Sequence, residues 1–169
     1  MWKKTPGLLF DVEGEALQKF SKDKIVLEIG SFLGKSSVCI AEVAKQLTCV
    51  DTFKADPKNS EDQNSSIFKE FSENTKEFKN ISVFKGTSNK FFKAAKVSLH
   101  VKFDFIFIDG AHNYEQVKKD IKNAKRHLNE GGLIACHDYN NIEKHAGVKK
   151  AVNELLEIIE KHGTLVVCK

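Results

Sequence analysis

The stretch FDFIFIDGAHNYE, residues Phe103–Glu115, indicates the fold of this chain more clearly than any other segment. Its five apolar residues are interrupted only by Asp104, and the apolar run ends at Asp109. A short apolar run without polar alternation is typical of a strand buried on both faces, as in a parallel sheet covered by helices. A glycine and an amphipathic helix follow. The sequence therefore predicts that Asp109 and His112 lie at the carboxyl end of a central strand, where open α/β sheets bind their ligands.

Strands and helices alternate along the rest of the chain. The apolar runs predict strands at Ile25–Ile29, Leu47–Val50, Ile81–Phe84, Phe103–Ile108 and Leu133–Cys136. Apolar residues at helical spacing predict helices at Val12–Phe20, Lys35–Leu47, Ile67–Phe78, Asn89–Val97, Tyr114–Leu128 and Val148–Leu156, with Gly131-Gly132 stopping the fifth. This alternation predicts an α/β fold, a Rossmann-like, doubly wound, mostly parallel sheet with helices on both faces.

Two segments have no single interpretation. Lys54–Ser66 is polar, contains a proline and lacks periodicity, so it is predicted to be irregular, either a lid over the substrate or a mobile surface loop. The twelve residues Ile158–Lys169 form either a helix end with one strand, or a short hairpin that turns at His162-Gly163.

Length and composition are typical of a single globular domain. The 169 residues are 41% hydrophobic and 30% charged, which suffices for one core. Residues 1–23 are predicted to form a helical cap segment on a core of residues 24–169. No apolar signal region follows Met1, and no run approaches the roughly 18 apolar residues of a membrane span. We therefore expect a cytoplasmic protein without a membrane partner, and a homo-oligomer stays open.

The charged residues and the cysteines argue against two further classes. The net charge of +4 comes mostly from lysines spread along the chain, with Arg126 as the single arginine, and dense basic runs with interleaved aromatics are absent. A solvated lysine surface is therefore expected, and no nucleic-acid partner. The four cysteines share no close spacing, so buried reduced thiols are expected in place of a disulfide framework or zinc site.

The turn after the first predicted strand, EIGSFLG at residues 28–34, has the properties of a nucleotide-binding turn. A glycine turn between a strand and a helix lets the backbone approach a nucleotide. Asp51 follows Gly30 by 21 residues and suits ribose hydroxyls. However, Phe32 replaces the middle glycine of the dinucleotide fingerprint, and Glu28 would repel a pyrophosphate. A cofactor with a ribose and a cationic part but no phosphate fits better, which points to S-adenosylmethionine.

The motifs EIGSFLGKSS, CVDTF, FKGTS, FIFIDGAHNYEQVKKDI and GGLIACHDY together resemble those of class I S-adenosylmethionine-dependent methyltransferases. They are most similar to the small-molecule O-methyltransferase branch that includes macrocin O-methyltransferase and cephalosporin-hydroxylase-like proteins, over roughly Pro6 to Lys169. The resemblance implies a cofactor pocket formed by Glu28, Gly30, Ser31, Phe32 and Ser36 of the turn, Asp51 on the ribose hydroxyls, Thr52 bordering the adenine, Gly86, Thr87 and Ser88 along its edge, and Asp109.

Asp109, His137 and Asp138 are the candidate metal ligands. The strands that precede them should be neighbours about 4.8 Å apart, so the carboxylates converge and need a cation or a proton between them. Oxygen ligands of this kind suit Mg²⁺. Relatives bind such a metal through acids at these strand ends, but His137 stands where several have Glu. It either ligates a softer ion such as Mn²⁺ or hydrogen-bonds outside the metal shell. A metal-free site, with Asp109 touching the cofactor, is the alternative.

His112 is the candidate general base, and the catalytic residues are predicted to be His112 and Asp109. An imidazole with a pKa of about 6.5 can accept a proton from a hydroxyl at neutral pH, although a helix-capping or surface role stays open. Four other histidines are predicted to be surface residues: His100, His127, His145 and His162. We expect transfer of a methyl group to a hydroxyl of a small polar acceptor, a sugar or a phenol. The alternatives are a nicotinamide-dependent oxidoreductase and a non-catalytic cofactor-binding relative.

Overall fold

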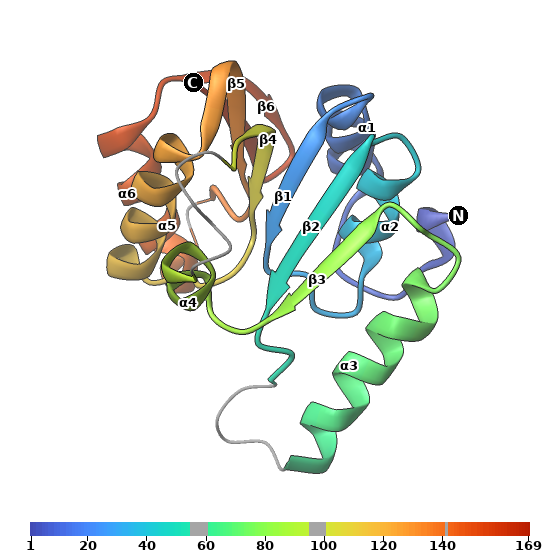
Figure 1. Ribbon diagram of the computed structural model, residues 1–169. Helices are drawn as coiled ribbons and strands as arrows, with labels where there is room; N and C mark the ends of the chain where they lie inside the picture. Colours follow the sequence, from blue (N-terminus) through green and yellow to red (C-terminus); the bar gives the residue numbers. More distant parts are fainter. Residues whose placement is uncertain (55–60, 95–100, 141) are drawn as a thin grey trace.

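A seven-stranded sheet runs through the protein in the order β3-β2-β1-β4-β5-β7-β6 (Figure 1). The computed structural model describes residues 1–54, 61–94, 101–140 and 142–169, with only the backbone for residues 61–65. The strands are β1 (Ile25–Ile29), β2 (Gln46–Asp51), β3 (Ile81–Lys85), β4 (Phe103–Ile108), β5 (Leu128–Cys136), β6 (Ile158–His162) and β7 (Leu165–Cys168). The first five are parallel, whereas β7 is antiparallel to β5 and β6. The predicted Rossmann-like, mostly parallel sheet is confirmed.

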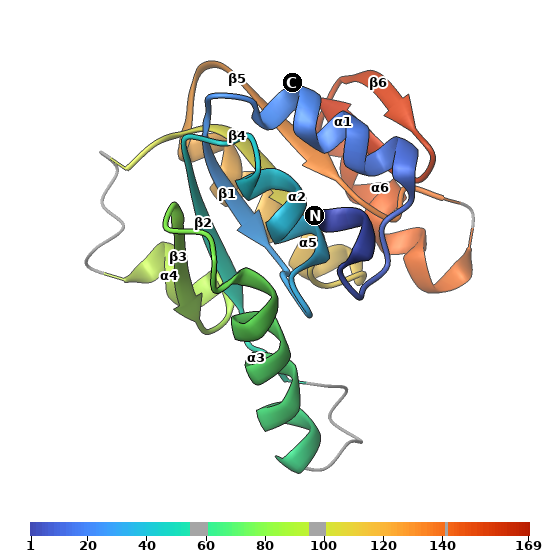
Figure 2. The ribbon, with the colours of Figure 1, turned by 90° about the vertical axis from the view of Figure 1, so that its right-hand side faces the viewer.

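Helices cover both faces of this sheet (Figures 1 and 2). They are α1 (Asp11–Ser21), α2 (Lys35–Ala41), α3 (Glu61–Thr75), α4 (Ser88–Lys93), α5 (Tyr114–Arg126) and α6 (Ala146–Leu155), with 3₁₀ turns at Trp2–Lys4 and Glu143–His145. One core cluster joins α1, α2 and α3 to the sheet, and the other joins α4, α5 and α6 to its opposite face. Within the described residues, no helix is long and apolar enough to cross a membrane.

Strand β4 shows why the apolar run lies at the centre. Phe105 and Phe107 belong to one core cluster, and Ile106 and Ile108 belong to the other, because successive side chains of a strand point to opposite faces. Its one polar residue, Asp104, is satisfied at the strand's amino end. The Asp104 carboxylate accepts hydrogen bonds from the Ile25 backbone N–H at 2.9 Å and from the Asn129 side chain at 2.7 Å.

Several predicted boundaries are wrong. The helix predicted to reach Leu128 ends at Arg126, and Gly131-Gly132 lie inside β5, since Leu128 already pairs with Phe103. The helix predicted to reach Leu47 ends at Ala41, because the backbone N–H groups of residues 45 and 46 donate to Lys24 O. The segment predicted to be irregular up to Ser66 is helical from Glu61, where neither glycine nor proline interrupts it. Residues 55–60 of that segment lie outside the described residues.

The structure also bears on the predictions for the C-terminal segment, for the helix after β3 and for the cysteines. The hairpin interpretation of Ile158–Lys169 is confirmed, because β6 and β7 pair antiparallel across Gly163, which has a φ of +62°. The helix predicted at Asn89–Val97 runs from Ser88 to Lys93, and residues 95–97 lie outside the described residues. All four cysteines are free and buried, as predicted.

Two histidines predicted to lie on the surface are buried. The exposed fractions are 5% for His127 and 6% for His145. Nδ1 of His127 lies 3.0 Å from the Val101 carbonyl oxygen. The surface prediction was wrong because a histidine with a fixed hydrogen-bond partner can be buried at little cost. His162 is partly exposed, and His100 lies outside the described residues.

Candidate active site

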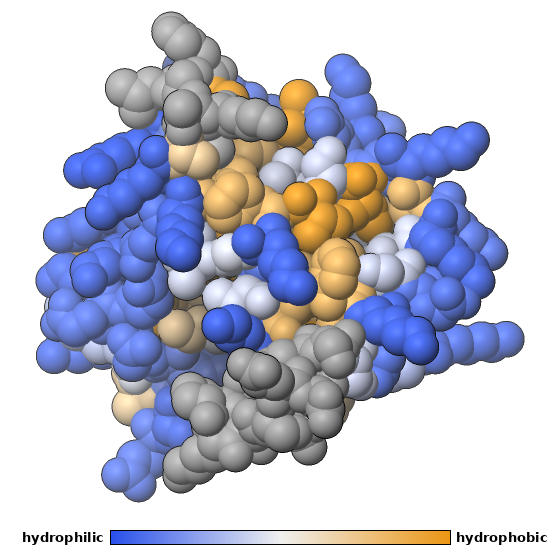
Figure 3. Space-filling model, turned by 60° about the horizontal axis from the view of Figure 1, so that its bottom comes forward, coloured by the Kyte–Doolittle hydropathy of each residue, from blue (hydrophilic) through white to orange (hydrophobic). Residues whose placement is uncertain are grey.

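A cavity of about 600 Å³ opens at the carboxyl ends of the parallel strands. Figure 3 views the molecule from this end, where apolar residues gather in the middle of a largely hydrophilic face. The cavity brings together residues that lie far apart in the sequence. Of the predicted site residues, those that line it are Gly30, Ser31, Phe32, Ser36, Asp51, Thr52, Gly86, Thr87, Ser88, Asp109, His112, His137 and Asp138.

The glycine turn after β1 has a backbone that only glycine can adopt at Gly30. Its φ is +92°, and a Cβ atom there would lie 2.1 Å from the Asp109 carbonyl oxygen. The turn and the end of β4 therefore pack backbone against backbone. Phe32, also at positive φ, leaves half of its surface exposed at the cavity.

Glu28 was predicted to line the cofactor pocket, but it lies beneath this turn, is fully buried and does not reach the cavity wall. Its carboxylate accepts hydrogen bonds from the hydroxyls of Ser36 at 2.6 Å and Ser31 at 2.8 Å, and from Ser37. The Cys49 thiol lies 3.3 Å away. Burial raises the pKa of Glu28, against these hydrogen bonds. The carboxyl group thus fixes the turn and the start of α2 from below.

Asp51 closes the turn from the end of β2. One carboxylate oxygen accepts the backbone N–H groups of Ser31 at 2.7 Å and Phe32 at 2.9 Å, and the other accepts that of Phe53 at 2.6 Å. A carboxylate has about four acceptor sites, so Asp51 can still accept hydrogen bonds from a ligand in the cavity.

A polar group at the α4–α5 side of the cavity was missed by the sequence analysis. The Gln116 amide donates to Ser88 Oγ at 3.2 Å and to Asp120 Oδ1 at 3.0 Å, and accepts from Asn89 at 3.0 Å. Asp120 is only 1% exposed, and burial raises its pKa. The sequence did contain a signal for Asp120, because it lies three residues after Val117 and therefore on the apolar face of α5.

Asp109 and His137 belong to a chain of charged groups that starts at the partly exposed Asp109 and ends at the buried Glu13 of α1. Nδ1 of His137 lies 3.3 Å from Asp109 Oδ1, and Nε2 lies 3.1 Å from Glu13 Oε2. Burial opposes the charged imidazole, but the surrounding carboxylates prevail and raise the pKa of His137 to about 12. Both ring nitrogens therefore face carboxylates.

Glu13 also was not found from sequence. It is fully buried and accepts hydrogen bonds from the Thr164 backbone N–H at 2.9 Å, the Thr164 hydroxyl at 2.8 Å and the Phe10 backbone N–H at 3.0 Å. Burial would raise the pKa of Glu13, but these bonds and His137 lower it to about 2. Glu13 thereby ties the N-terminal helix to the ends of β5 and β7.

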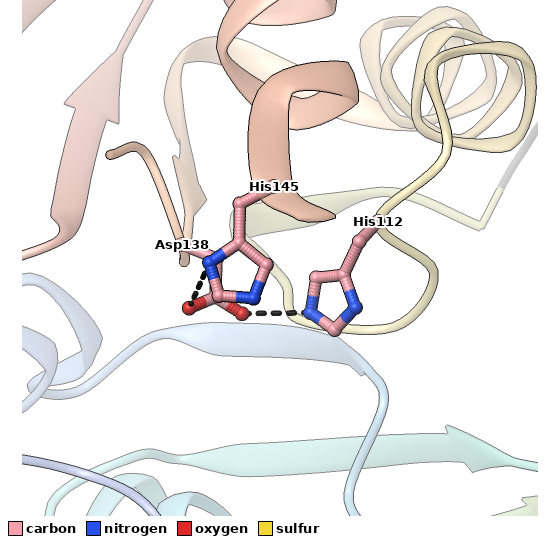
Figure 4. A group of neighbouring side chains, drawn as sticks. All are labelled: His112, Asp138 and His145. Carbon is pink, nitrogen blue, oxygen red and sulfur yellow. Dashed lines mark ion pairs between the residues drawn. The ribbon is translucent and has the colours of Figure 1, made fainter. Parts of the chain in front are cut away.

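His112 and His145 flank the Asp138 carboxylate (Figure 4). Nε2 of His112 lies 2.7 Å from Asp138 Oδ2, and Nδ1 of His145 lies 3.2 Å from Asp138 Oδ1. Asp138 raises the pKa of His112, whereas burial lowers the pKa of His145. Burial opposes the charge on Asp138, but His112 and His137 hold its pKa well below the usual range.

Two sets of side chains among the described residues have the spacing of metal ligands. Asp109, His137 and Asp138 form one, and His112, Asp138 and His145 form the other, each with ligand atoms within 4.8 Å of one another. In the first set, the carboxylates of Asp109 and Asp138 fit Mg²⁺, which prefers oxygen ligands. Because both nitrogens of His137 face carboxylates, its arrangement fits a hydrogen-bonding role outside the metal shell.

Comparison with known proteins begins with a family match over residues 27–139, described as a methyltransferase domain. A curated but uncharacterized protein of Acanthamoeba polyphaga mimivirus is 35% identical over 57 residues, which cover 34% of this chain and 26% of that protein. The aligned part of the chain thus spans about a quarter of that relative.

Solved structures share the fold at low sequence identity. An O-methyltransferase from Bacillus cereus, in complex with SAH, aligns with a TM-score of 0.69 and 15% identity over 98% of this chain and 84% of that chain. Aeropyrum pernix fibrillarin, with natively bound S-adenosyl-L-methionine, gives 0.63 and 15% over 89% and 68%. Methanococcus jannaschii fibrillarin, a pre-rRNA processing protein, gives 0.65 and 17% over 99% and 82%. These neighbours differ in described role, so they leave the acceptor open.

Proposed function

Since the chain belongs to a family of methyltransferase domains, we propose that it transfers the methyl group of S-adenosylmethionine to a hydroxyl of a small polar acceptor, a sugar or a phenol. This assigns it to the small-molecule O-methyltransferase branch described above. One observation carries the proposal. His112, paired with Asp138 at 2.7 Å, lines the same cavity as the glycine turn and Asp51.

The cofactor end of the cavity supports a ribose-bearing, cationic ligand. Asp51 offers a carboxylate with remaining acceptor capacity, and Ser31 and Thr52 lie beside it. The Asp109 and Asp138 carboxylates line the same cavity and favour a positively charged ligand over a pyrophosphate. When bound, S-adenosylmethionine would supply an electrophilic methyl group on a sulfonium.

His112 is proposed as the base. Its Nε2 nitrogen is held by Asp138, and its second ring nitrogen lies on the side of the ring away from that carboxylate (Figure 4). With the Nε2 proton donated to Asp138, Nδ1 has a lone pair that can accept the proton of the acceptor hydroxyl. The oxygen then attacks the methyl carbon while the carbon–sulfur bond breaks, so the reaction needs no further redox partner.

A divalent cation, Mg²⁺ or Mn²⁺, is proposed on the Asp109 and Asp138 carboxylates. It would lower the pKa of an acceptor hydroxyl and relieve the repulsion between the two acids. His137, charged and bonded to Glu13, would orient Asp109 from behind.

Cofactor choice is tested first by binding. Titration calorimetry with S-adenosylmethionine and with NAD should give measurable binding only for the former. NAD binding without S-adenosylmethionine binding would refute the proposal.

Methyl transfer is then assayed as release of S-adenosylhomocysteine over a panel of sugars and phenols. His112→Ala should lower kcat at least about 100-fold with little change in cofactor affinity. His162→Ala, which changes a histidine on β6, is the matched control and should retain wild-type kcat. Unchanged turnover in His112→Ala would exclude His112 as the base, and activity that survives EDTA would exclude the cation.

A further inference from the structure

The cavity contains a second set of potential ligands, two imidazoles and one carboxylate. His112 comes from the turn between β4 and α5, Asp138 follows β5, and His145 precedes α6 (Figure 4). Each oxygen of the Asp138 carboxylate faces one imidazole, at 2.7 Å for His112 and 3.2 Å for His145. The two rings lie side by side, with centroids 4.7 Å apart.

The backbone aims the carboxylate at these rings. Asp138 has a φ of +61°, in the left-handed region that residues other than Gly, Asn and Asp rarely adopt. Asp tolerates this conformation better than most residues do, so the turn can hold the carboxylate in this direction. His145 is 6% exposed, so its ring is held in place by packing.

The spacing suits an ion with imidazole ligands. One ligand atom from each of the three residues can be chosen within 4.8 Å of the others. A tetrahedral ion with bonds of about 2.1 Å separates its ligands by about 3.4 Å, so small side-chain rotations suffice. Three protein ligands would leave the fourth position open. Imidazole nitrogens favour late first-row ions such as Zn²⁺, whereas Mg²⁺ prefers oxygen alone.

We propose that His112, Asp138 and His145 form a binding site for Zn²⁺ or a similar late first-row divalent ion. The site shares Asp138 with the proposed Mg²⁺ contacts but uses two imidazole nitrogens and omits Asp109, so the two ions would compete for the Asp138 carboxylate. Nδ1 of His145 also lies 2.9 Å from Nδ2 and 3.2 Å from Oδ1 of the Asn140 side chain. This neutral amide must turn aside if Nδ1 is the ligand.

Zn²⁺ in this site would stop methyl transfer, and this consequence rests on the proposed function. The ion takes the Nε2 lone pair of His112, so the proton of the neutral imidazole resides on Nδ1. Nδ1 is then a donor and cannot accept the hydroxyl proton. The site would thus make the enzyme sensitive to Zn²⁺ without affecting the cofactor end of the cavity.

The binding test uses the full chain, titrated with Zn²⁺ by calorimetry and with Co²⁺ by visible absorption. We expect one Zn²⁺ per chain, with excess Mg²⁺ unable to displace it, and Co²⁺ bands typical of low-coordinate nitrogen and oxygen ligands. His112→Ala and His145→Gln should each weaken binding at least about 10-fold. His112 is 43% exposed in its side chain, so His112→Ala tests the site even if His145→Gln fails to fold. His162→Ala is the control and should bind Zn²⁺ like the wild type.

Two results would overturn the proposal. One is the absence of stoichiometric Zn²⁺ binding. The other is binding that survives both histidine substitutions but is lost in Asp109→Asn, which would assign the ion to the other ligand set. The binding measurements do not require methyl transfer, so an inactive protein would count against the proposed function alone. In active protein, Zn²⁺ at its Kd should halve the rate, and the absence of inhibition at saturation would refute the link to His112.

Discussion

Replacing Glu13 by glutamine tests whether the buried Glu13–His137 pair stabilises the fold. Glutamine has nearly the shape of the protonated acid but no charge. Its oxygen can still accept both bonds from Thr164, but its NH₂ group then faces the Phe10 N–H and the ring nitrogen of His137, where the carboxylate accepts. Glu13→Gln should therefore lower the free energy of unfolding.

The pKa of Glu13 sets the magnitude. It is lowered from 4.5 to about 2, and each unit corresponds to about 1.4 kcal/mol, so the ionised form stabilises the protein by about 3 kcal/mol at pH 7. A depressed pKa gives stability that is present above the unfolded value of 4.5 and is lost as the pH falls toward 2. At pH 3 the contribution should be about 1.4 kcal/mol, less than half of that at pH 7.

Urea denaturation, followed by circular dichroism at pH 7 and pH 3, measures both numbers. Glu15→Gln is the matched control on the same helix, because Glu15 is 65% exposed and pairs with Lys3, whose side chain is 52% exposed. It should change stability by less than about 0.5 kcal/mol at either pH. A cost of Glu13→Gln below about 1 kcal/mol at pH 7, or an equal cost at both pH values, would refute the reasoning.

Three further predictions concern the site and the core. Gly30→Ala should abolish S-adenosylmethionine binding, because the added Cβ would lie 2.1 Å from the Asp109 carbonyl oxygen. Gly131→Ala is the control, since Gly131 has a similar φ but open space around it; it should lower the free energy of unfolding in urea by about 1 kcal/mol and leave binding intact. Because Asp138 raises the pKa of His112 and a base acts unprotonated, kcat/KM should rise with pH through a value above 6.5, and Asp138→Asn should move that value down; an unmoved profile would remove the pair from the mechanism. The four buried thiols should react with Ellman's reagent only after unfolding, and fast labelling of the native protein would contradict their burial.

The fold was accessible from the sequence because its main signals are local. An apolar run without alternation, such as Phe103–Ile108, can be satisfied only by burial on both faces. Once strands and helices alternate, the carboxyl ends of the parallel strands must meet at one edge, so the sequence alone predicts that Asp51, Asp109 and Asp138 lie together. Two of the boundary errors came from contacts outside the local pattern, such as the pairing of Leu128 with Phe103.

Only the tertiary structure decided how the charged groups are paired. Glu13 and His137 are 124 residues apart, and no periodicity marks either as a partner of the other. Likewise, Glu28 lies under the turn and His145 beside Asp138 because packing removes both from water and each must then find hydrogen-bond partners. The spacing of residues along one element predicts which apolar side chains are buried, whereas the pairing of buried polar groups depends on which elements come into contact. The sequence alone therefore determined where the site lies, and the assembled fold determined which of its groups can hold a proton or an ion.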